Sequence, residues 1–171
     1  MTAPQDWLVG LQSRGIRLGL ERMRQVLEDI ELPGRVIRVG GTNGKGSVCA
    51  FLDSILRQTG HDVGVYTSPE LERMNERIVV NGTAISDEEL DQHTRWLMHQ
   101  DVELTFFEAM TAIALRHFQG VDITILEVGM GGRCDATAAI DADMTVITNV
   151  SLEHTQHLGT SIEAIAGEIA G

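Results

Sequence analysis

The sequence predicts an α/β fold in which helices flank a mostly parallel sheet, and three observations support this prediction. Strand-like and helix-like segments alternate along the 171 residues. A short apolar strand leads through a glycine-rich loop into a helix, an order typical of phosphate-binding α/β proteins. Hydrophobic residues make up 43% of the chain, which is ordinary for a globular protein with its own core.

The first half of the chain is expected to hold two helices and two strands. A helix is predicted over 18–30, because its apolar residues recur at a spacing that places them on one helical face. Residues 36–39 and 62–66 are predicted strands, since both are short and rich in valine. The helix between them is predicted over 47–58.

The second half is expected to begin with a small hairpin. Residues 77–80 and 83–85 form its two strands around an Asn-Gly pair, which favours the tight turn of a β-hairpin. Further strands are predicted over 121–127 and 144–148.

Three helix starts share one capping pattern, in which a Ser or Thr is followed three residues later by Glu. Each side chain of such a pair bonds to the backbone N–H of the other residue. The pairs are Ser86 with Glu89, Thr105 with Glu108, and Thr160 with Glu163. They predict helices over 87–99, 106–118 and 161–170.

Charge and cysteine content narrow the function classes. The net charge is −12 and the isoelectric point about 4.8, which argues against a surface that binds nucleic acid or anionic lipid. No apolar run reaches the ~18 residues that span a bilayer, and the first residues lack the regions of a signal peptide. Cys49 and Cys134 are too few for a disulfide framework, so we expect a cytoplasmic protein.

The loop after the first predicted strand is a candidate phosphate site. Its glycines allow the backbone to approach an anion, and backbone N–H groups at a helix start attract phosphate. The expected nucleotide-binding residues are Gly41, Thr42, Asn43, Gly44, Lys45, Gly46 and Ser47. Lys45 would contact the β- and γ-phosphates of a nucleotide such as ATP, and the Ser47 hydroxyl would ligate Mg²⁺ or a phosphate oxygen.

The loop departs from the general P-loop pattern G-x-x-x-x-G-K-[ST]. Val39 occupies the position of the first glycine, and Gly46 stands where Ser or Thr follows the lysine. The alternative is a glycine-rich turn with an exposed lysine, but the strand-to-helix context favours phosphate binding.

Six motifs in fixed order resemble one protein family. They are G-T-N-G-K-G-S (41–47), Y-T-S-P (66–69), N-E-R-I (75–78), F-F-E (106–108), L-E-V-G-M-G-G-R-C-D-A-T (126–137) and I-T-N-V-S-L-E-H-T-x-x-L-G (147–159). Together they resemble the folylpolyglutamate synthase/dihydrofolate synthase family, a branch of the Mur-type ATP-dependent amide ligases. Six ordered motifs are far more specific than one phosphate loop.

The resemblance implies a fold, a reaction and a set of small-molecule partners. The fold would be the P-loop-containing central domain of a Mur ligase. The family joins L-glutamate to a carboxylate of dihydropteroate or a folate, after ATP has converted that carboxylate to an acyl phosphate. Family members are much longer, so residues 1–171 are expected to be the N-terminal part of the ATP-binding domain, without the C-terminal glutamate-binding domain. The oligomeric state is left open.

The resemblance also implies metal-binding and catalytic residues. Ser68, Glu127 and His154 correspond to Mg²⁺ ligands of the family, beside Ser47 in the phosphate loop, and Lys45, Glu127 and His154 would be the catalytic groups. Carboxylate and hydroxyl oxygens suit Mg²⁺, whereas histidine is a poorer ligand, so the assignment of His154 rests on the resemblance. The alternatives are a solvated strand end for Glu127 and a loop histidine bonded to backbone for His154.

Three further residues are implied to bind the substrate. Asp135 resembles the residue that hydrogen-bonds the pterin ring, whose amino groups suit a carboxylate acceptor. Phe107 resembles the aromatic residue that packs on the pterin face, although core packing explains it equally well. Arg133 projects from the same glycine-rich turn as Asp135, at Gly129–Gly132.

Four positions depart from the family pattern. Glu70 stands where the family commonly has histidine, Glu153 where it has aspartate, and Ala138 where it has asparagine. Ile169 replaces a lysine that is carbamylated in the family and helps to hold a second Mg²⁺.

These departures leave a second interpretation open, a non-catalytic nucleotide-binding or interaction module derived from the family. A third, an unrelated P-loop kinase, would make the later motifs a coincidence.

Overall fold

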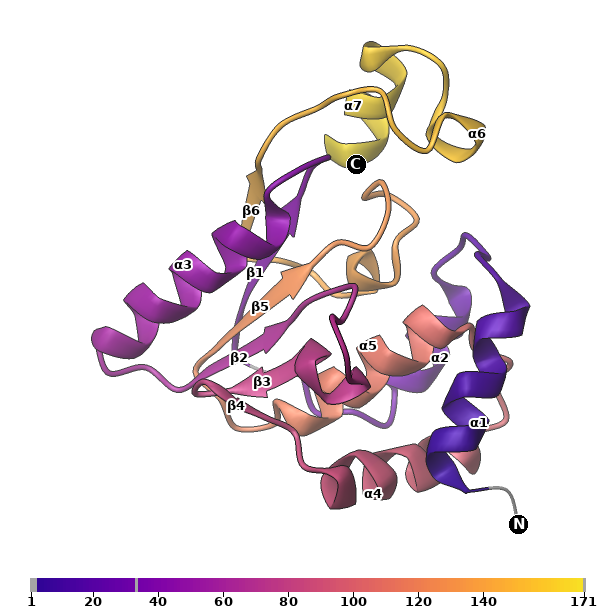
Figure 1. The fold of residues 1–171 in the computed structure, drawn as a ribbon, viewed down its shortest axis with the longest axis vertical. Helices are drawn as coiled ribbons and strands as arrows, with labels where there is room; N and C mark the ends of the chain where they lie inside the picture. Colours follow the sequence, from indigo (N-terminus) through magenta and orange to yellow (C-terminus); the bar gives the residue numbers. More distant parts are fainter. Residues whose placement is uncertain (1–2, 33, 171) are drawn as a thin grey trace.

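A computed structural model describes residues 3–32 and 34–170, and it confirms an α/β fold around one six-stranded sheet. The strands are β1 (Arg35–Gly40), β2 (Val63–Tyr66), β3 (Ile78–Val80), β4 (Thr83–Ala84), β5 (Ile123–Glu127) and β6 (Met144–Ile147). Their order is β4-β3-β2-β5-β1-β6 (Figure 1). Strands β2, β5, β1 and β6 are parallel, and β3 and β4 add an antiparallel edge, so the sheet is mostly parallel as predicted.

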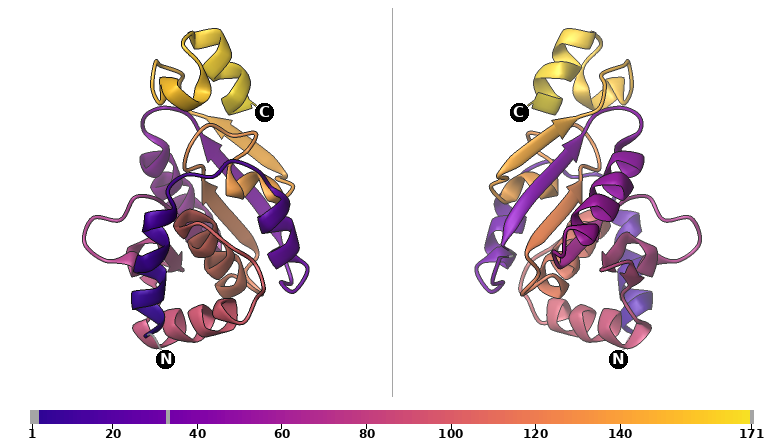
Figure 2. Two further views of the ribbon diagram at one scale, coloured as in Figure 1. Left: turned by 90° about the vertical axis from the view of Figure 1, so that its right-hand side faces the viewer. Right: turned by 90° about the vertical axis from the view of Figure 1, so that its left-hand side faces the viewer.

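Helices pack on both faces of the sheet, and two of them lie beyond the ends of the strands (Figure 1). The helices are α1 (Pro4–Leu11), α2 (Glu21–Leu27), α3 (Lys45–Gln58), α4 (Asp87–Met98), α5 (Phe106–His117), α6 (Thr155–Leu158) and α7 (Ile162–Ala170). Short 3₁₀ turns occupy Gln12–Arg14, Met74–Arg77 and Ala136–Ala139. Helix α3 lies on one face, α5 lies on the other, and α1, α2 and α4 pack around α5 (Figures 1 and 2).

Two apolar cores correspond to the two faces. The smaller core joins α3 to the sheet through residues such as Val39, Cys49 and Ile125. The larger core is centred on α5, eight of whose twelve residues are buried. Burial all round α5 explains why its sequence, unlike that of a surface helix, is apolar on nearly every face.

The hairpin and two of the three capping boxes are confirmed. Asn81 (φ 52°) and Gly82 (φ 80°) both adopt the left-handed conformation that a two-residue hairpin turn needs. Ser86 and Thr105 cap α4 and α5 together with their partner glutamates. The third predicted capping box, Thr160 with Glu163, is wrong by one residue. The Ser161 hydroxyl accepts the Ala164 N–H at 3.2 Å, and α7 begins at Ile162.

Two helix predictions need correction, and two helices were not predicted. The helix expected over 18–30 is confined to Glu21–Leu27, because Gly19 (φ 126°) holds an irregular segment before it. Helix α3 begins two residues earlier than expected, at Lys45. Helices α1 and α6 were not predicted, since eight and four residues are too short to establish a clear period.

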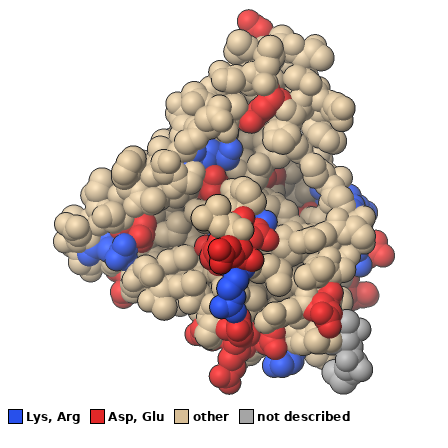
Figure 3. Space-filling model, viewed as in Figure 1, with Lys and Arg blue, Asp and Glu red and all other residues tan. Residues whose placement is uncertain are grey.

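The surface agrees with the acidic composition, since Asp and Glu side chains outnumber Lys and Arg on the face drawn in Figure 3. Among the described residues, no helix combines the length and apolar character that a membrane crossing requires.

Candidate functional site

The carboxyl ends of the parallel strands meet at one edge of the sheet, and the conserved geometry of α/β proteins places ligands there. Val39 is in register with Glu127, and Tyr66 with Leu126, so the loops after β1, β2 and β5 begin side by side. The phosphate loop, Ser68 and Glu127 are therefore brought together, as the sequence predicted.

The phosphate loop makes a sharp turn that only glycine accommodates at its start. Gly41 has φ 125°, and a Cβ there would lie 2.9 Å from the carbonyl oxygen of Asn149. The backbone N–H of Thr42 donates to this same oxygen at 3.0 Å, and the N–H of Asn43 donates to Oδ1 of Asn149 at 3.0 Å. The segment after β6 thus holds the outer side of the loop.

The inner side of the loop offers hydrogen-bond donors. The backbone N–H groups of Gly44, Lys45 and Ser47 have no acceptor among the described residues, and they stand at the start of the 14-residue helix α3. The Lys45 ammonium folds back and donates to the carbonyl oxygens of Gly41 (2.8 Å) and Thr42 (3.2 Å). Such a cradle of N–H groups and one cation matches the charge and shape of a phosphate group.

Glu127 lies beneath this cradle as a buried carboxylate. It is 5% exposed, and its Oε2 accepts the backbone N–H of Ser68 at 3.0 Å. Burial raises the pKa of Glu127, while the Ser68 N–H and the Lys45 charge act in the opposite direction. A bound cation would favour the ionised carboxylate, so the donor chemistry fits a hard metal ion.

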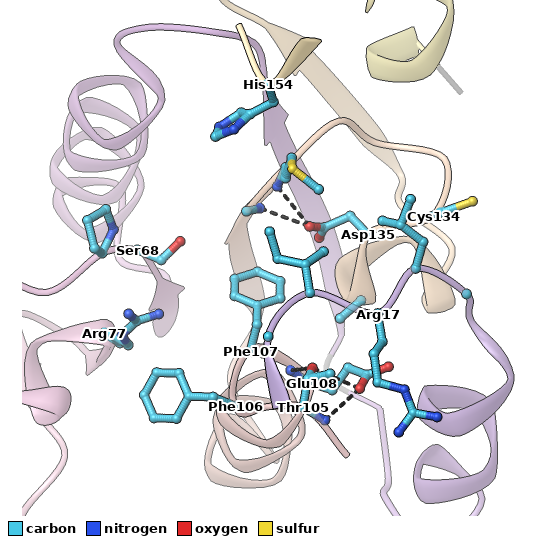
Figure 4. Close-up of a pocket in the computed structure, with 18 of the residues that line it drawn as sticks. Arg17, Ser68, Arg77, Thr105, Phe106, Phe107, Glu108, Cys134, Asp135 and His154 are labelled. Atoms are coloured by element: carbon cyan, nitrogen blue, oxygen red, sulfur yellow. Dashed lines mark hydrogen bonds between the residues drawn. The ribbon is translucent and has the colours of Figure 1, made fainter. Parts of the chain in front are cut away.

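The other predicted metal ligands lie around the same space. The Ser68 side chain points into the open space of the cleft, and His154 stands at its far rim (Figure 4). His154 has φ 45°, an uncommon conformation for a residue other than glycine. Ser47 is exposed in the first turn of α3. The described part of the chain contains no cluster of three or more His, Cys, Asp or Glu residues arranged for a metal ion.

A cleft of about 440 Å³ extends from the phosphate loop toward the N-terminal ends of α2 and α5. Its lining brings together five of the predicted site residues: Lys45, Ser68, Phe107, Asp135 and His154. It also contains residues that the sequence did not single out as site residues: Gly15–Gly19, Pro69, Arg77, Thr105, Phe106, Glu108, Met130 and Cys134.

Phe107 forms an aromatic shelf in the cleft. Its ring lies 5.8 Å from that of buried Tyr66 at 49°, and its tip is so close to Gly129 that a Cβ on that glycine would lie 2.6 Å from Cζ. The ring is half-buried: one face packs against the protein, and the other faces the cleft.

The Asp135 carboxylate forms its hydrogen bonds within its own loop. Its carboxylate accepts the backbone N–H groups of Gly129 (3.1 Å), Met130 (3.1 Å) and Thr137 (3.0 Å), and also the Thr137 hydroxyl (2.6 Å). Burial raises its pKa, and these four bonds oppose that change. Asp135 therefore fixes the glycine turn that faces Phe107, and direct contact with a pterin ring stays a prediction.

Arg133 lies away from the cleft and is absent from its described lining. Its guanidinium donates to the Gly167 carbonyl oxygen at 3.2 Å and lies 4.0 Å from Glu168, while its backbone N–H donates to the Glu168 carbonyl oxygen. The side chain thus joins the glycine turn to α7, and its predicted contact with substrate stays untested.

An irregular segment, residues 15–20, forms one wall of the cleft. The exposed side chains of Ile16 and Leu18 stand in it, between Gly15 (φ 63°) and Gly19 (φ 126°). Arg22 fastens the segment: it donates to the Arg17 carbonyl oxygen at 2.7 Å and pairs with the buried Glu108 carboxylate at 2.8 Å.

Ile169, which departs from the family pattern, is buried in a small apolar cluster with Leu158 and Ile165. Its Cγ2 is 3.7 Å from the position of a Cβ at Gly40, so it packs α7 against the start of the phosphate loop. The consequence of this isoleucine for metal binding stays a prediction.

Comparison with known proteins places this geometry in a family. Residues 39–169 match the Mur ligase middle domain. The dihydrofolate synthase/folylpolyglutamate synthase of Bacillus subtilis is 43% identical over 187 residues, covering 99% of this chain and 44% of the relative. The Escherichia coli protein of the same name is 43% identical over 176 residues, covering 97% of this chain and 41% of the relative.

Solved structures agree with the sequence relatives. The structure of E. coli FolC in complex with DHPP and ADP matches with a TM-score of 0.91 at 41% identity, covering 99% of this chain and 44% of that one. A bifunctional folylpolyglutamate synthase/dihydrofolate synthase with Mn, AMPPNP and L-glutamate bound matches with a TM-score of 0.88 at 40% identity. The match covers 100% of this chain and 44% of that one. This chain thus spans less than half the length of these relatives. It belongs to the Mur ligase middle-domain family, among the dihydrofolate synthase/folylpolyglutamate synthases.

Proposed function

We propose that residues 1–171 form the ATP- and pterin-binding part of a ligase that adds L-glutamate to dihydropteroate or a folate. The observation that carries the proposal is the single cleft that contains both Lys45 of the phosphate loop and the Phe107 shelf. A phosphate donor and a planar aromatic acceptor would then lie in one continuous space, as a phosphoryl transfer between them requires.

Each end of the cleft has a distinct task. The N–H groups of Gly44, Lys45 and Ser47 would hold the phosphates, and Lys45 would exchange its bonds to the loop carbonyls for bonds to a phosphate oxygen. Phe107 would support the flat ring of the acceptor, with the acceptor's carboxylate directed toward the phosphate-loop end of the cleft. Ser68, Glu127 and His154, together with Ser47, would hold Mg²⁺.

ATP would supply the phosphoryl group that converts the acceptor carboxylate to an acyl phosphate, and Mg²⁺ would offset the repulsion between these anions. The chain's own contribution is to hold the acceptor, to keep water from the buried carboxylate of Glu127, and to place one cation, Lys45, at the junction. The L-glutamate that attacks the acyl phosphate belongs to the activity of the whole protein.

The second candidate is a nucleotide-binding module without ligase activity. The burial of Ile169 against the phosphate loop favours it, because an isoleucine there cannot hold a metal ion. The two functions differ at the Phe107 end of the cleft, since only the ligase needs a site for the pterin. A cytoplasmic location and small-molecule partners alone, with neither nucleic acid nor membrane, accompany both proposals.

Binding of pteroate, followed by quenching of its fluorescence, tests the ligase proposal. We expect the parent to bind pteroate and Phe107→Ala to bind it about tenfold more weakly, since a ring that supports a planar ligand contributes about 1 kcal/mol or more. Phe51→Ala is the matched control, because Phe51 is 68% exposed on α3, outside the cleft. Absence of pteroate binding to the parent, or equal binding to Phe107→Ala, would overturn the proposal.

A further inference from the structure

Glu70 and Arg77 form a partly buried ion pair, of which Arg77 lines the cleft. Nε and Nη2 of Arg77 both donate to Oε2 of Glu70, and the two side chains are only 9% and 21% exposed. The pair connects the loop after β2 to the 3₁₀ turn before β3, and Arg77 itself lines the cleft. An ion pair so poorly exposed is screened less by solvent than a surface pair.

The Arg77 guanidinium is fixed on a second side by an aromatic ring. Its Cζ lies 5.1 Å from the centroid of Phe106, within the range of a cation–π contact. The Arg77 guanidinium borders the open space of the cleft, near Ser68 (Figure 4).

Arg77 is the cation best placed to meet the carboxylate of an acceptor. Three cations line the described part of the cleft, and Lys45 is assigned to the phosphates. Arg17 is 45% exposed and lies 3.6 Å from Glu103, which is itself exposed at the surface. Arg77 alone is buried, and two of its nitrogens, Nε and Nη2, already contact Glu70.

We propose that Glu70 is a specificity-determining residue, which holds the Arg77 guanidinium and so limits how strongly the cleft prefers a carboxylate-bearing acceptor over a neutral one of the same shape. The carboxylate of Glu70 competes with that of the ligand for the same donors. The inference rests on the proposed function, because it assigns Arg77 to the acceptor.

The test compares pteroate with its methyl ester, which removes the negative charge and keeps the rings. The measured quantity is the ratio of the two dissociation constants for each variant. Glu70→Gln keeps the size of the side chain and removes its charge, so we expect it to increase the preference for pteroate over the ester about tenfold. Glu70→Asp keeps the charge and is expected to leave the ratio within about threefold of the parent.

Two further variants separate this role from general effects. Glu72→Gln removes one negative charge from the same loop at an exposed position without a bond to Arg77, so its ratio should equal that of the parent. Glu70→Gln in an Arg77→Gln background should have no effect on the ratio, because Glu70 acts through Arg77.

The outcomes distinguish the two claims. If the parent binds neither pteroate nor its ester, the proposed function fails, and the inference fails with it. If the parent binds both and Glu70→Gln leaves the ratio unchanged, or if Glu72→Gln changes it equally, the inference alone is overturned. Thermal melting of each variant shows that a changed ratio belongs to folded protein.

Discussion

The backbone N–H of Ser68 donates to Oε2 of Glu127 at 3.0 Å, which joins the loop after β2 to the end of β5. This bond crosses 59 residues of sequence and places a buried carboxylate beside the start of α3. Neither residue could form the site alone, because Glu127 needs donors to remain charged and the loop needs an anchor beside the phosphate cradle.

The buried carboxylate predicts a pH dependence of stability. Burial raises the pKa of Glu127 above its ordinary value of 4.5, so the folded state holds this proton more tightly than the unfolded chain. The stability that protonated Glu127 contributes to the folded state is fully present below about pH 4.5. It is lost as the pH rises through the raised pKa of the folded state. We therefore expect Glu127→Gln to gain stability relative to the parent between pH 4.5 and pH 7.

Urea denaturation at several pH values, with metal ions removed by a chelator, measures this difference. Glu88→Gln on the exposed side of α4 is the control and should follow the parent. A gap between Glu127→Gln and the parent that stays constant with pH would contradict the prediction.

A histidine pair predicts the opposite dependence. His93 lies against Arg116 and 3.3 Å from Nδ1 of His117, and burial, with the charges of Arg116 and His117, lowers its pKa from 6.5 to about 4. Its contribution to stability is present above pH 6.5 and is lost as the pH falls through about 4. His93→Gln should therefore lose less stability than the parent between pH 6.5 and pH 4.

Thermal melting across this range provides the measurement. His157→Gln, at an exposed position in α6, is expected to lose stability in parallel with the parent. Parallel curves for the parent and His93→Gln would show that the pair does not titrate as described.

The Arg22–Glu108 pair predicts a large loss of stability when one partner is removed. Glu108 is 3% exposed and accepts the Thr105 N–H and hydroxyl as well as Arg22. Arg22→Met leaves this carboxylate without its cation, and breaking a buried pair in this way costs about 3 kcal/mol or more. Chemical denaturation measures the unfolding free energy of Arg22→Met. The control is Arg24→Met, at an exposed arginine of the same helix, which should lose less than about 0.5 kcal/mol.

Gly64 predicts a steric limit at the centre of the sheet. A Cβ on this residue of β2 would lie 2.6 Å from Cγ of Phe118, the ring atom attached to the side chain's stem, which cannot move without shifting the α5 core. Gly64→Ala should therefore cost about 1–3 kcal/mol of unfolding free energy. Gly10→Ala in α1, where a Cβ would meet nothing within 4 Å, should be neutral or stabilising by up to about 1 kcal/mol. Equal unfolding free energies for the two variants would contradict this account.

Local signals in the sequence were enough to predict most of the sheet and the phosphate loop. Strand β1, its glycine loop and α3 are contiguous, so their order alone indicates the cradle. The capping boxes of α4 and α5 are equally local, because both partners of each box lie within one helical turn.

The far end of the cleft depends on contacts that no local pattern reveals. Arg22 and Glu108 are 86 residues apart, and only the packing of α2 on α5 brings them together. Residues 15–19 line the same cleft as Phe107 although they are far from it in sequence, which is why they were not predicted to line the site. Arg133, predicted to bind substrate, donates to the Gly167 carbonyl oxygen of α7, a contact between distant segments that the sequence pattern does not reveal.

Lys45 is the single lysine of the sequence, so its side chain can be observed by itself. In protein labelled with ¹³C-lysine, the NMR signal of its ε-CH₂ group reports the environment of the ammonium directly. If the phosphate loop binds nucleotide, Mg·ATP will shift this signal in a saturable manner, while adenosine, which has no phosphate, will leave it unmoved. A lysine signal that Mg·ATP does not move at any concentration would contradict the assignment of residues 41–47 as the nucleotide site, and with it the proposed function.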